Sequence, residues 1–356
     1  MTTVRSDRLA SETKLIERIT RAVPSILGGG RKGRAGQPGV RLGIGDDAAV
    51  LAPSGRTDWV LSCDAFLDGV HFLASRHSAD SVGFKSLARA TSDLAAMGAA
   101  PRFFLLTLAL PLDRTGAWLD QFLGGMARAA RTLGIYLLGG DTKRYSVVAI
   151  SITVIGEIAP RKAVPRSGTR PGDIIYVSGR LGQAELGLQV VRRTAPNALR
   201  ARLRMDRSFR QLLQPHLYPK IRLKLGAWLA RTGIASAMMD ISDGLSTDLG
   251  HVCTSSGVAA RVWAERIPCV GASAAQAKYL SQLRLDPLQL ALHGGDDYEL
   301  LFTVPPRHAA RLRRAPGFAE VRAIGEIEKG KGMLLVGRDG RSRRLEPGGW
   351  DPFRKP

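Results

Sequence analysis

Short apolar segments alternate with longer segments of helical spacing along the chain, and this alternation limits the possible folds more than any other feature. At 81–97 the apolar residues recur with the period of an α-helix, and at 103–110 they form the continuous run of a buried strand. The other predicted strands lie at 40–44, 48–51, 59–63, 135–138, 147–158, 174–178, 237–241, 300–304 and 333–336, and the other predicted helices at 12–23, 115–133, 184–193, 219–232 and 245–255. A polar, arginine-rich connection is expected after 193, and a short apolar segment lies at 289–292. Strands and helices that alternate in this way predict an α/β protein.

The chain is too long for one ordinary hydrophobic core, since its 356 residues favour two domains. The segment 160–171 (PRKAVPRSGTRP) is rich in proline, glycine and charge, and it is the best candidate for a domain boundary. We therefore expect an N-terminal domain at 1–159 and a C-terminal domain at 160–356.

The formal net charge of +21 raises the question of a nucleic-acid partner. Arginine and lysine are spread over the whole chain, with local concentrations at 192–210 and 307–314. Aromatic residues make up only 6% of the chain, which is little for stacking on single strands. A solvated basic surface is therefore predicted in preference to nucleic-acid binding, and small phosphorylated substrates would suit the same charge.

Neither a targeting segment nor a cysteine framework is indicated. The first seventeen residues mix charged side chains without the apolar block of a signal peptide, and no apolar run reaches the length of about 18 residues that a membrane span needs. Cys63, Cys253 and Cys269 are far apart and lack the spacing of a zinc site. These features predict a cytoplasmic protein without a membrane partner.

Aspartates beside glycines or small residues form the most informative pattern, because they recur at the ends of predicted strands and helices. They occur in GIGDDAAV (Asp46, Asp47), LSCDAF (Asp64), TSDLAAMG (Asp93), LLGGDT (Asp141), MMDISDG (Asp240, Asp243) and HGGDDYELLF (Asp296, Asp297). One such aspartate most often marks a turn or a helix cap. If all of them converge, their mutual repulsion requires a cation between them. Since histidine and cysteine are scarce in the motifs, we expect Mg²⁺ or Mn²⁺, which bind oxygen ligands together with substrate phosphates.

The motifs that are absent narrow the reaction. The chain has no G-x-x-x-x-G-K-[ST] loop, no H-R-D and D-F-G pair, no G-x-S-x-G elbow and no G-x-G-x-x-G that opens a helix after a strand. Phosphoryl transfer fits the remaining pattern best, because its transition state requires positioning and charge neutralisation more than covalent catalysis.

Taken in order, several motifs resemble those of the thiamine-monophosphate kinase family, in the superfamily with the aminoimidazole-ribonucleotide-synthetase-like fold. These motifs are GIGDDAAV, LSCDAFLDGVHF, SDLAAMGA, LGGDT, RSGTRPGD, DISDGLSTDLGH and GGDDYELLFT. The resemblance implies an α/β (α+β) fold of two synthetase-like domains, each a mixed sheet covered by helices, with the second domain completing the active-site cleft, and it implies a homodimer. It further implies direct in-line transfer from ATP to thiamine monophosphate with several Mg²⁺ ions. No catalytic side chain is implied beyond this metal-mediated transfer, because an ionised phosphate is already a nucleophile.

The resemblance also implies roles for individual residues. The implied metal ligands are Asp46, Ser62, Cys63, Asp64, Asp93, Asp141, Asp240 and Asp243. The implied ATP contacts are Gly140, Asp141, Arg166 and Ser242, and the implied contacts of thiamine monophosphate are His71, Asp296 and Trp350.

Three positions depart from the usual pattern of the family, and several roles stay open. Cys63 stands where threonine is usual, Asp296 where glutamate is usual, and Trp350 where tyrosine is usual. For Asp47, Asp248 and Asp297 a cap or turn role is as well supported as a ligand role. The alternative functions are another ATP-using reaction of the same superfamily and a basic, Mg²⁺-binding nucleic-acid-binding protein.

Overall fold

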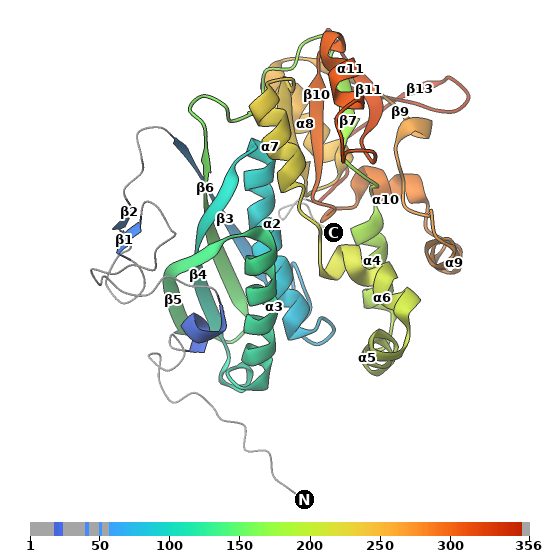
Figure 1. Cartoon of the computed structure of the whole chain (residues 1–356). Helices are drawn as coiled ribbons and strands as arrows, with labels where there is room; N and C mark the ends of the chain where they lie inside the picture. Colours follow the sequence, from blue (N-terminus) through green and yellow to red (C-terminus); the bar gives the residue numbers. More distant parts are fainter. Residues whose placement is uncertain (1–17, 24–39, 43–49, 52–56, 351–356) are drawn as a thin grey trace, which may run out of the picture. The chain divides into compact units, whose positions relative to one another are not determined.

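The structure is a computed structural model that describes residues 18–23, 40–42, 50–51 and 57–350. Its residues form two compact units. The first contains the described residues up to Leu94 and those from Ala100 to Arg161, and the second contains Ala95–Ala99 and the described residues from Lys162 onward. Each unit combines a mixed sheet with helices, which confirms the predicted α/β class (Figure 1).

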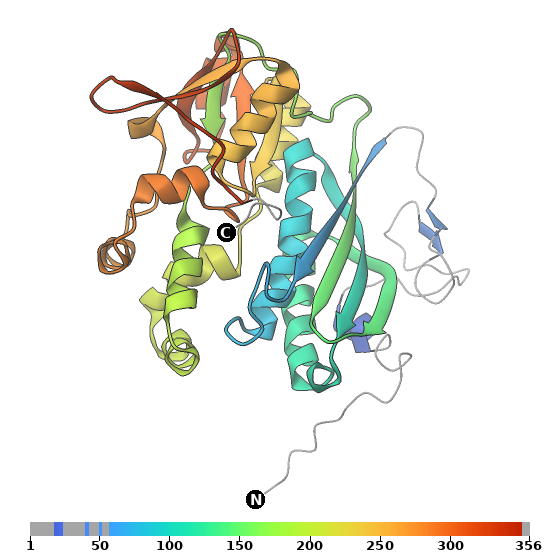
Figure 2. The same ribbon diagram turned by 180° about the vertical axis from the view of Figure 1, so that it is seen from behind.

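A four-stranded sheet in the order β3-β6-β4-β5 forms the centre of the first unit. Its strands are β3 (Asp58–Leu67), β4 (Ala100–Leu110), β5 (Tyr136–Arg144) and β6 (Ala149–Ile158). β4 and β5 are parallel, whereas β6 is antiparallel to both β3 and β4. Helices α2 (Ala79–Met97) and α3 (Ala117–Leu133) cover the same face of the sheet (Figures 1 and 2). The short elements are η1 (Leu112–Arg114) and the antiparallel pair β1 (Val40–Leu42) and β2 (Val50–Leu51).

Two glycines allow α2 and α3 to pack backbone against backbone. A Cβ atom at Gly83 of α2 would lie 1.9 Å from the carbonyl oxygen of Phe122, and one at Gly125 of α3 would lie 1.9 Å from that of Asp80. Only glycine fits at such distances. This close packing fixes the position of α2, the helix that carries Asp93.

A seven-stranded sheet in the order β13-β12-β9-β11-β7-β10-β8 forms the centre of the second unit. Its strands are β7 (Ile174–Val177), β8 (Ala237–Ile241), β9 (Ala259–Trp263), β10 (Glu299–Val304), β11 (Arg322–Glu328), β12 (Gly332–Val336) and β13 (Ser342–Arg344). The β9–β12 pair is parallel and the other pairs are antiparallel. The main core packs side chains of this sheet, such as Ile175 and Leu301, against Leu249 of α8 (Leu245–Ser256) and Leu292 of α10 (Pro287–His293).

A second core in the same unit holds a helical lobe together. Its helices are α4 (Gln183–Arg193), α5 (Pro196–Met205), α6 (Arg207–Leu217) and α9 (Ala274–Leu283). The prediction of a polar connection after residue 193 was wrong, because α5 and α6 occupy this segment. Leu199, Phe209 and Leu213 are buried in the lobe core, and the guanidinium of Arg202 lies 4.0 Å from the ring centroid of Phe209. The many arginines concealed the helical spacing of these few apolar residues.

Other predicted bounds in the second unit also needed correction. The helix predicted at 219–232 begins later, as α7 (Leu223–Thr232), and the apolar segment at 289–292 belongs to α10. Strands β9, β11 and β13 were not predicted. The remaining short elements are η2 (Ala264–Arg266), η3 (Pro306–His308) and α11 (Ala309–Arg313). Among the described helices, none has the length and apolar character that a membrane crossing requires.

Candidate active site

β3 and α2 bring one group of candidate residues together in the first unit. Ser62 and Asp64 are two positions apart on β3, so their side chains point to the same face of the sheet. The hydroxyl of Ser62 donates a hydrogen bond to Oδ2 of Asp93 on α2. Arg89, one helical turn before Asp93, forms an ion pair with Asp64, with 2.9 Å between Nε and Oδ2. The contact between β3 and α2 therefore holds two carboxylates, one from each element, and one arginine from α2.

The carboxyl group of Asp93 lies in an environment that disfavours its charge. Burial raises its pKa, and the hydrogen bond from Ser62 and the charge of Arg89 only partly offset this effect. Arg89 is held in place by a hydrogen bond of 3.0 Å to the carbonyl oxygen of Ala65 and by the ring of Phe66, whose centroid lies 5.2 Å from the guanidinium carbon. An additional cation near Asp93 would therefore stabilise the ionised carboxylate.

Cys63 points away from this group, whereas His71 adjoins it through Phe66, whose ring centroid lies 5.7 Å from that of His71. Cys63 alternates with Ser62 and Asp64, so its exposed side chain points to the opposite face, where Sγ lies 3.5 Å from Oγ of Ser151. His71 follows β3 in a turn, and its Nδ1 accepts a hydrogen bond of 3.1 Å from the backbone N–H of Leu67. Only the backbone of Cys63 can therefore take part on the α2 face.

Asp141 also lies on the face of the sheet opposite to Asp64. The strand register aligns Asp141 with Thr107 of β4, whereas Gly140 aligns with Leu106, in the same row as Asp64. The exposed carboxylate of Asp141 forms an ion pair of 3.2 Å with Lys143. The structure therefore brings Asp64 and Asp93 together and does not bring Asp141 to them.

Two aspartates that were expected at strand ends lie inside strands. β3 continues to Leu67 and β5 continues to Arg144, so the strands predicted at 59–63 and 135–138 were too short. Polar residues at exposed positions interrupt the apolar pattern, but backbone pairing continues through Asp64 and Asp141. Pairing partners distant in sequence set these strand ends.

A second carboxylate group surrounds the loop between β8 and α8 in the second unit. Asp240 is buried on β8, Asp243 lies in the loop, and Asp248 is buried in the first turns of α8. Oδ2 of Asp248 accepts a hydrogen bond of 3.2 Å from the backbone N–H of Asp243. Burial, together with the charges of Asp240 and Asp243, raises the pKa of Asp248 to about 8. These three carboxyl groups therefore lie close enough to repel one another.

The other oxygen of Asp248 identifies this group as a candidate cation site. Oδ1 is buried, and no hydrogen-bond donor from the described part of the chain reaches it. A buried carboxylate oxygen without a partner is costly unless it is protonated or bound to a cation. From the sequence, Asp248 could be either a helix cap or a metal ligand. Its position five residues after Asp243 in DISDGLSTD is the signal that could have indicated a role beside Asp243.

The loop before β10 packs directly against the β8–α8 loop. The backbone N–H of Asp296 donates a hydrogen bond of 2.8 Å to the carbonyl oxygen of Ser242, and the hydroxyl of Tyr298 donates one of 2.6 Å to Oδ1 of Asp296. Asp296 and Tyr298 both have positive φ angles, 68° and 50°, which side-chain-bearing residues rarely adopt. Strained backbone of this kind is typical of functional loops.

Asp297 has a structural role in the same loop. Its Oδ2 accepts a hydrogen bond of 2.6 Å from the N–H of Gly182, and its Oδ1 accepts one of 3.1 Å from the N–H of Ala184. Both donors belong to the start of α4, so Asp297 caps a helix that is distant in sequence. Burial raises the pKa of Asp297 to about 8 although both hydrogen bonds act in the opposite direction.

Trp350, the last described residue, contacts the β8–α8 loop. Its backbone N–H donates a hydrogen bond of 3.0 Å to the carbonyl oxygen of Asp243, and its side chain is 48% exposed. Arg166 is exposed and follows Pro165, whose carbonyl oxygen accepts a hydrogen bond of 3.0 Å from the N–H of Met238 on β8. The second unit therefore gathers Asp240, Ser242, Asp243, Asp296 and Trp350, while Arg166 lies farther along β8.

The donor chemistry of both groups suits Mg²⁺. Asp46 and Asp47 lie outside the described residues, and in the described part of the chain no three His, Cys, Asp or Glu side chains are arranged to hold a metal ion by themselves. Mg²⁺ usually binds one or two protein carboxylates and completes its shell with water and substrate phosphates. A carboxylate pair such as Asp240 with Asp243 beside Asp248 fits this mode of binding.

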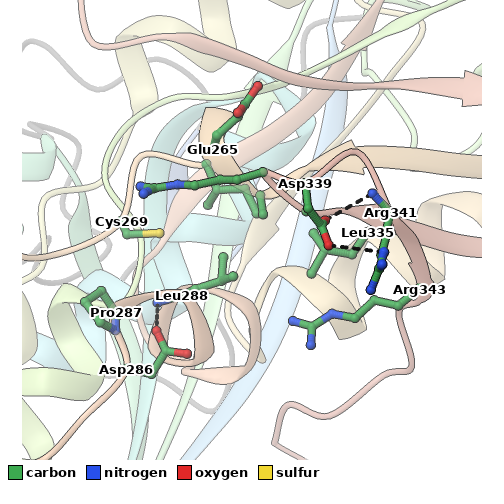
Figure 3. A pocket seen from close by; sticks show the side chains of 13 residues that line it. Glu265, Cys269, Asp286, Pro287, Leu288, Leu335, Asp339, Arg341 and Arg343 are labelled. Carbon is green, nitrogen blue, oxygen red and sulfur yellow. Dashed lines mark hydrogen bonds and ion pairs between the residues drawn. The ribbon is translucent and has the colours of Figure 1, made fainter.

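A cavity of about 600 Å³ lies elsewhere in the second unit, and none of the described candidate residues lines it (Figure 3). Its walls include Cys269, Leu288 and Leu335, and Arg341 at its rim pairs with Asp339. Burial raises the pKa of the Cys269 thiol to about 11, so the thiol remains protonated and is a weak nucleophile. This cavity is therefore not the candidate active site.

Two family models match the chain in succession. The model of the AIR synthase related protein, N-terminal domain, matches residues 45–158, and the model of the AIR synthase related protein, C-terminal domain, matches residues 170–337. Both carboxylate groups lie within the matched residues.

Bacterial thiamine-monophosphate kinases are similar to the chain over most of its length. The thiamine-monophosphate kinase of Salmonella typhimurium is 36% identical over 325 residues, which are 91% of this chain and 95% of that protein. The thiamine-monophosphate kinase of Aquifex aeolicus is 32% identical over 310 residues, 87% of this chain and 92% of that protein.

Solved structures of similar proteins share the fold. The crystal structure of thiamine-monophosphate kinase from Stenotrophomonas maltophilia K279a has a TM-score of 0.75 and 34% identity, over 94% of this chain and 98% of that one. AaThiL complexed with AMPPCP and TMP has a TM-score of 0.72 and 31% identity, over 85% of this chain and 89% of that one.

Proposed function

The chain belongs to the AIR synthase related protein family and, within it, to the thiamine-monophosphate kinases, and on this premise we propose that it transfers the γ-phosphoryl group of ATP to thiamine monophosphate. An oxygen of the acceptor phosphate attacks the γ-phosphorus in line with the leaving group. The bond between the γ-phosphorus and the bridging oxygen breaks, and ADP and thiamine diphosphate are released. The complex of AaThiL with AMPPCP and TMP supports this pair of substrates.

The observation that carries the proposal is the environment of Asp248. It is a buried carboxyl group with an unpartnered Oδ1 and a pKa raised to about 8, beside Asp240 and Asp243. Such a group either holds a proton or has positive charge nearby, and the binding of a polyphosphate with divalent ions would bring that charge. Burial also raises the pKa of Asp93 in the first unit.

We assign the metal ligands as the family resemblance implies. They are Asp46, Ser62, Cys63, Asp64, Asp93, Asp141, Asp240 and Asp243. The proposed ATP contacts are Gly140, Asp141, Arg166 and Ser242, and the proposed contacts of thiamine monophosphate are His71, Asp296 and Trp350. Bound Mg²⁺ ions would neutralise the negative charge of the triphosphate and of the acceptor phosphate. Asp141 would have to join from the other face of the sheet, and Cys63 would act through its backbone oxygen.

The chain's own residues orient the ligands and need no general base. The hydroxyl of Ser62 orients Asp93, Arg89 fixes Asp64, and the N–H of Asp243 fixes Asp248. The acceptor phosphate is ionised at neutral pH, so no proton has to be removed before attack. We propose that each domain, 1–159 and 160–356, supplies part of the ligand set, and that the enzyme is a cytoplasmic homodimer.

An ADP-release assay with a panel of acceptors tests the proposal. Purified protein with ATP and Mg²⁺ is expected to form ADP when thiamine monophosphate is added, and to form little with thiamine, aminoimidazole ribonucleotide or buffer alone. Thiamine diphosphate should appear in equal amount to ADP, as measured by chromatography. Absence of turnover at every concentration of thiamine monophosphate would refute the substrate, and turnover with another acceptor would replace it.

A further inference from the structure

The last described residues form a strap that is fixed at both ends. Leu345 is 5% exposed within the main core of the second unit, and its backbone N–H donates a hydrogen bond of 2.9 Å to the carbonyl oxygen of Met333 on β12. At the other end, the N–H of Trp350 binds the carbonyl oxygen of Asp243 at 3.0 Å. We call residues 345–350 the C-terminal strap.

Two hydroxyl groups in the first turn of α8 hold the middle of the C-terminal strap. The N–H of Gly348 donates a hydrogen bond of 3.1 Å to Oγ of Ser246, and the N–H of Gly349 donates one of 3.1 Å to Oγ1 of Thr247. Ser246 is buried, and its Oγ also lies 2.9 Å from Nδ1 of His293 at the end of α10. Three successive backbone N–H groups of the strap are therefore bound by α8 and by the loop that precedes it.

The two glycines of the strap are required by its close approach to these elements. A Cβ atom at position 349 would lie 1.8 Å from the carbonyl oxygen of Asp243 and 2.7 Å from Oγ1 of Thr247. A Cβ atom at position 348 would lie 2.5 Å from Nδ1 of His293. A larger residue at Gly349 would meet backbone atoms, which cannot move aside as a flexible side chain can.

The C-terminal strap delivers an aromatic side chain without burying it. A tail that only stabilised the fold would gain most by burying its tryptophan. The side chain of Trp350 is nevertheless 48% exposed, although its backbone is bound to Asp243 of the β8–α8 loop. We infer that Ser246, Thr247 and His293 are positioning residues, which act through the C-terminal strap to hold Trp350 at the acceptor site. The inference rests on the proposed function, in which Trp350 contacts thiamine monophosphate.

Hydrogen exchange of the full-length protein tests the strap itself, independently of activity. Thr247→Val removes the hydroxyl and keeps the shape of the side chain, and Gly349→Ala introduces the Cβ clash. In both variants the amides of residues 348–350 should exchange at least about tenfold faster than in the wild type, with α8 and β12 unchanged. Ser255→Ala, an exposed hydroxyl farther along α8, is the control and should leave exchange unchanged.

Kinetics of the same variants test whether the strap acts on the acceptor. The KM for thiamine monophosphate should rise about tenfold in Thr247→Val, with kcat and the KM for ATP within about twofold of the wild type. Trp350→Ala should raise the same KM, and the double variant should be no worse than Trp350→Ala alone, because Thr247 acts through Trp350.

The possible results separate this inference from the proposed function. Unchanged strap exchange in Gly349→Ala would overturn the inference, and so would faster exchange with an unchanged KM for the acceptor, or additive effects in the double variant. If the wild type did not use thiamine monophosphate, the proposed function would fail together with the acceptor role of Trp350. Faster exchange in both variants would even then support Thr247 as the residue that holds the strap.

Discussion

At the residue scale, the partners of three aspartates separate a structural role from two proposed functional ones. Burial raises the pKa of Asp93, Asp248 and Asp297 alike. Both oxygens of Asp297 accept backbone hydrogen bonds from the start of α4, whereas Oδ1 of Asp248 has no such partner among the described residues. Asp93 is bound by a single side-chain hydroxyl, that of Ser62. Burial alone therefore does not distinguish a helix cap from a candidate ligand, whereas the hydrogen-bond partners of each oxygen do.

Replacing Asp93 with asparagine should separate activity from stability. Asp93→Asn keeps the size of the side chain and an acceptor for Ser62 but removes the charge, so we expect turnover to fall by about 100-fold or more. Because burial already disfavours the charged form, the thermal midpoint should be unchanged or slightly higher. Asp113→Asn, whose side chain is 69% exposed in η1, is the control. Full activity of Asp93→Asn would remove Asp93 from the metal site.

The pH dependence of stability should depend on Asp297. Its pKa is about 8 in the folded protein against 3.8 for the ordinary carboxyl group, so the folded state binds the proton more tightly. The stabilisation from the protonated form is complete below pH ~4 and is lost as the pH rises through about 8. Between pH ~5 and ~8 the thermal midpoint of the wild type should therefore fall more than that of Asp297→Asn. Equal slopes for the two proteins would show that Asp297 does not contribute.

At the element scale, the helical lobe of α4, α5, α6 and α9 has its own core beside the main sheet. Its arginines lie mostly on the outside, and three of them also stabilise the lobe. Arg202 stacks on Phe209, Arg193 donates to the carbonyl oxygen of Leu283 at the end of α9, and Arg210 donates to carbonyl oxygens of the last turn of α5. Arg193 and Arg210 therefore bind carbonyl groups at the C-terminal ends of helices, where positive charge is favourable.

The lobe core should dominate the stability of this segment. Phe209 is 1% exposed, so Phe209→Ala should lower the free energy of unfolding by about 3–5 kcal/mol. Met205, four residues earlier at the end of α5, is 87% exposed. Met205→Ala should therefore change the free energy of unfolding by no more than about 0.5 kcal/mol. Urea unfolding followed by circular dichroism measures both. A small effect of Phe209→Ala would show that the lobe is not a cooperative part of the unit.

At the scale of the whole molecule, a strongly basic chain carries two groups of buried and half-buried carboxylates. The net charge of +21 attracts anions over the surface as a whole, while Asp64, Asp93, Asp240 and Asp243 would, in the proposed function, provide local negative charge for divalent cations. The net positive charge acts over long distances, whereas the carboxylates act only on ions that are close to them. Attraction of ATP and a phosphorylated acceptor is therefore compatible with acidic groups that bind the accompanying ions.

Binding of ATP with Mg²⁺ should stabilise the whole protein. At a ligand concentration of about 100 times Kd, the linkage amounts to about 2.7 kcal/mol, which a thermal-shift assay detects as an increase of several degrees. Addition of EDTA should abolish the increase. Asp93→Asn in the first unit and Asp243→Asn in the second should each reduce it, because the proposed ligand set includes residues of both units. A shift that persists in EDTA would exclude a metal-dependent mode of ATP binding.

The sequence by itself determined the α/β class, most of the strands and helices, and the family. These properties depend on local patterns, namely the apolar period within each segment and the order of the glycine and aspartate motifs. The arginine-rich segment 196–217 was missed because its apolar residues are few, and its helices become evident only when Leu199 and Phe209 are seen to share a core. The site residues were named from motifs, whereas their partners could not be.

Only the tertiary structure decided which of these residues meet. It joined Ser62 to Asp93 across 31 positions, Gly349 to Thr247 across 102 and Asp297 to Gly182 across 115. It also placed Asp141 on the sheet face opposite to Asp64. The physical reason is that strand register and helix packing set the direction of each side chain, and both depend on residues far away in the sequence. A motif therefore specifies the chemistry of its residues, and packing specifies their neighbours.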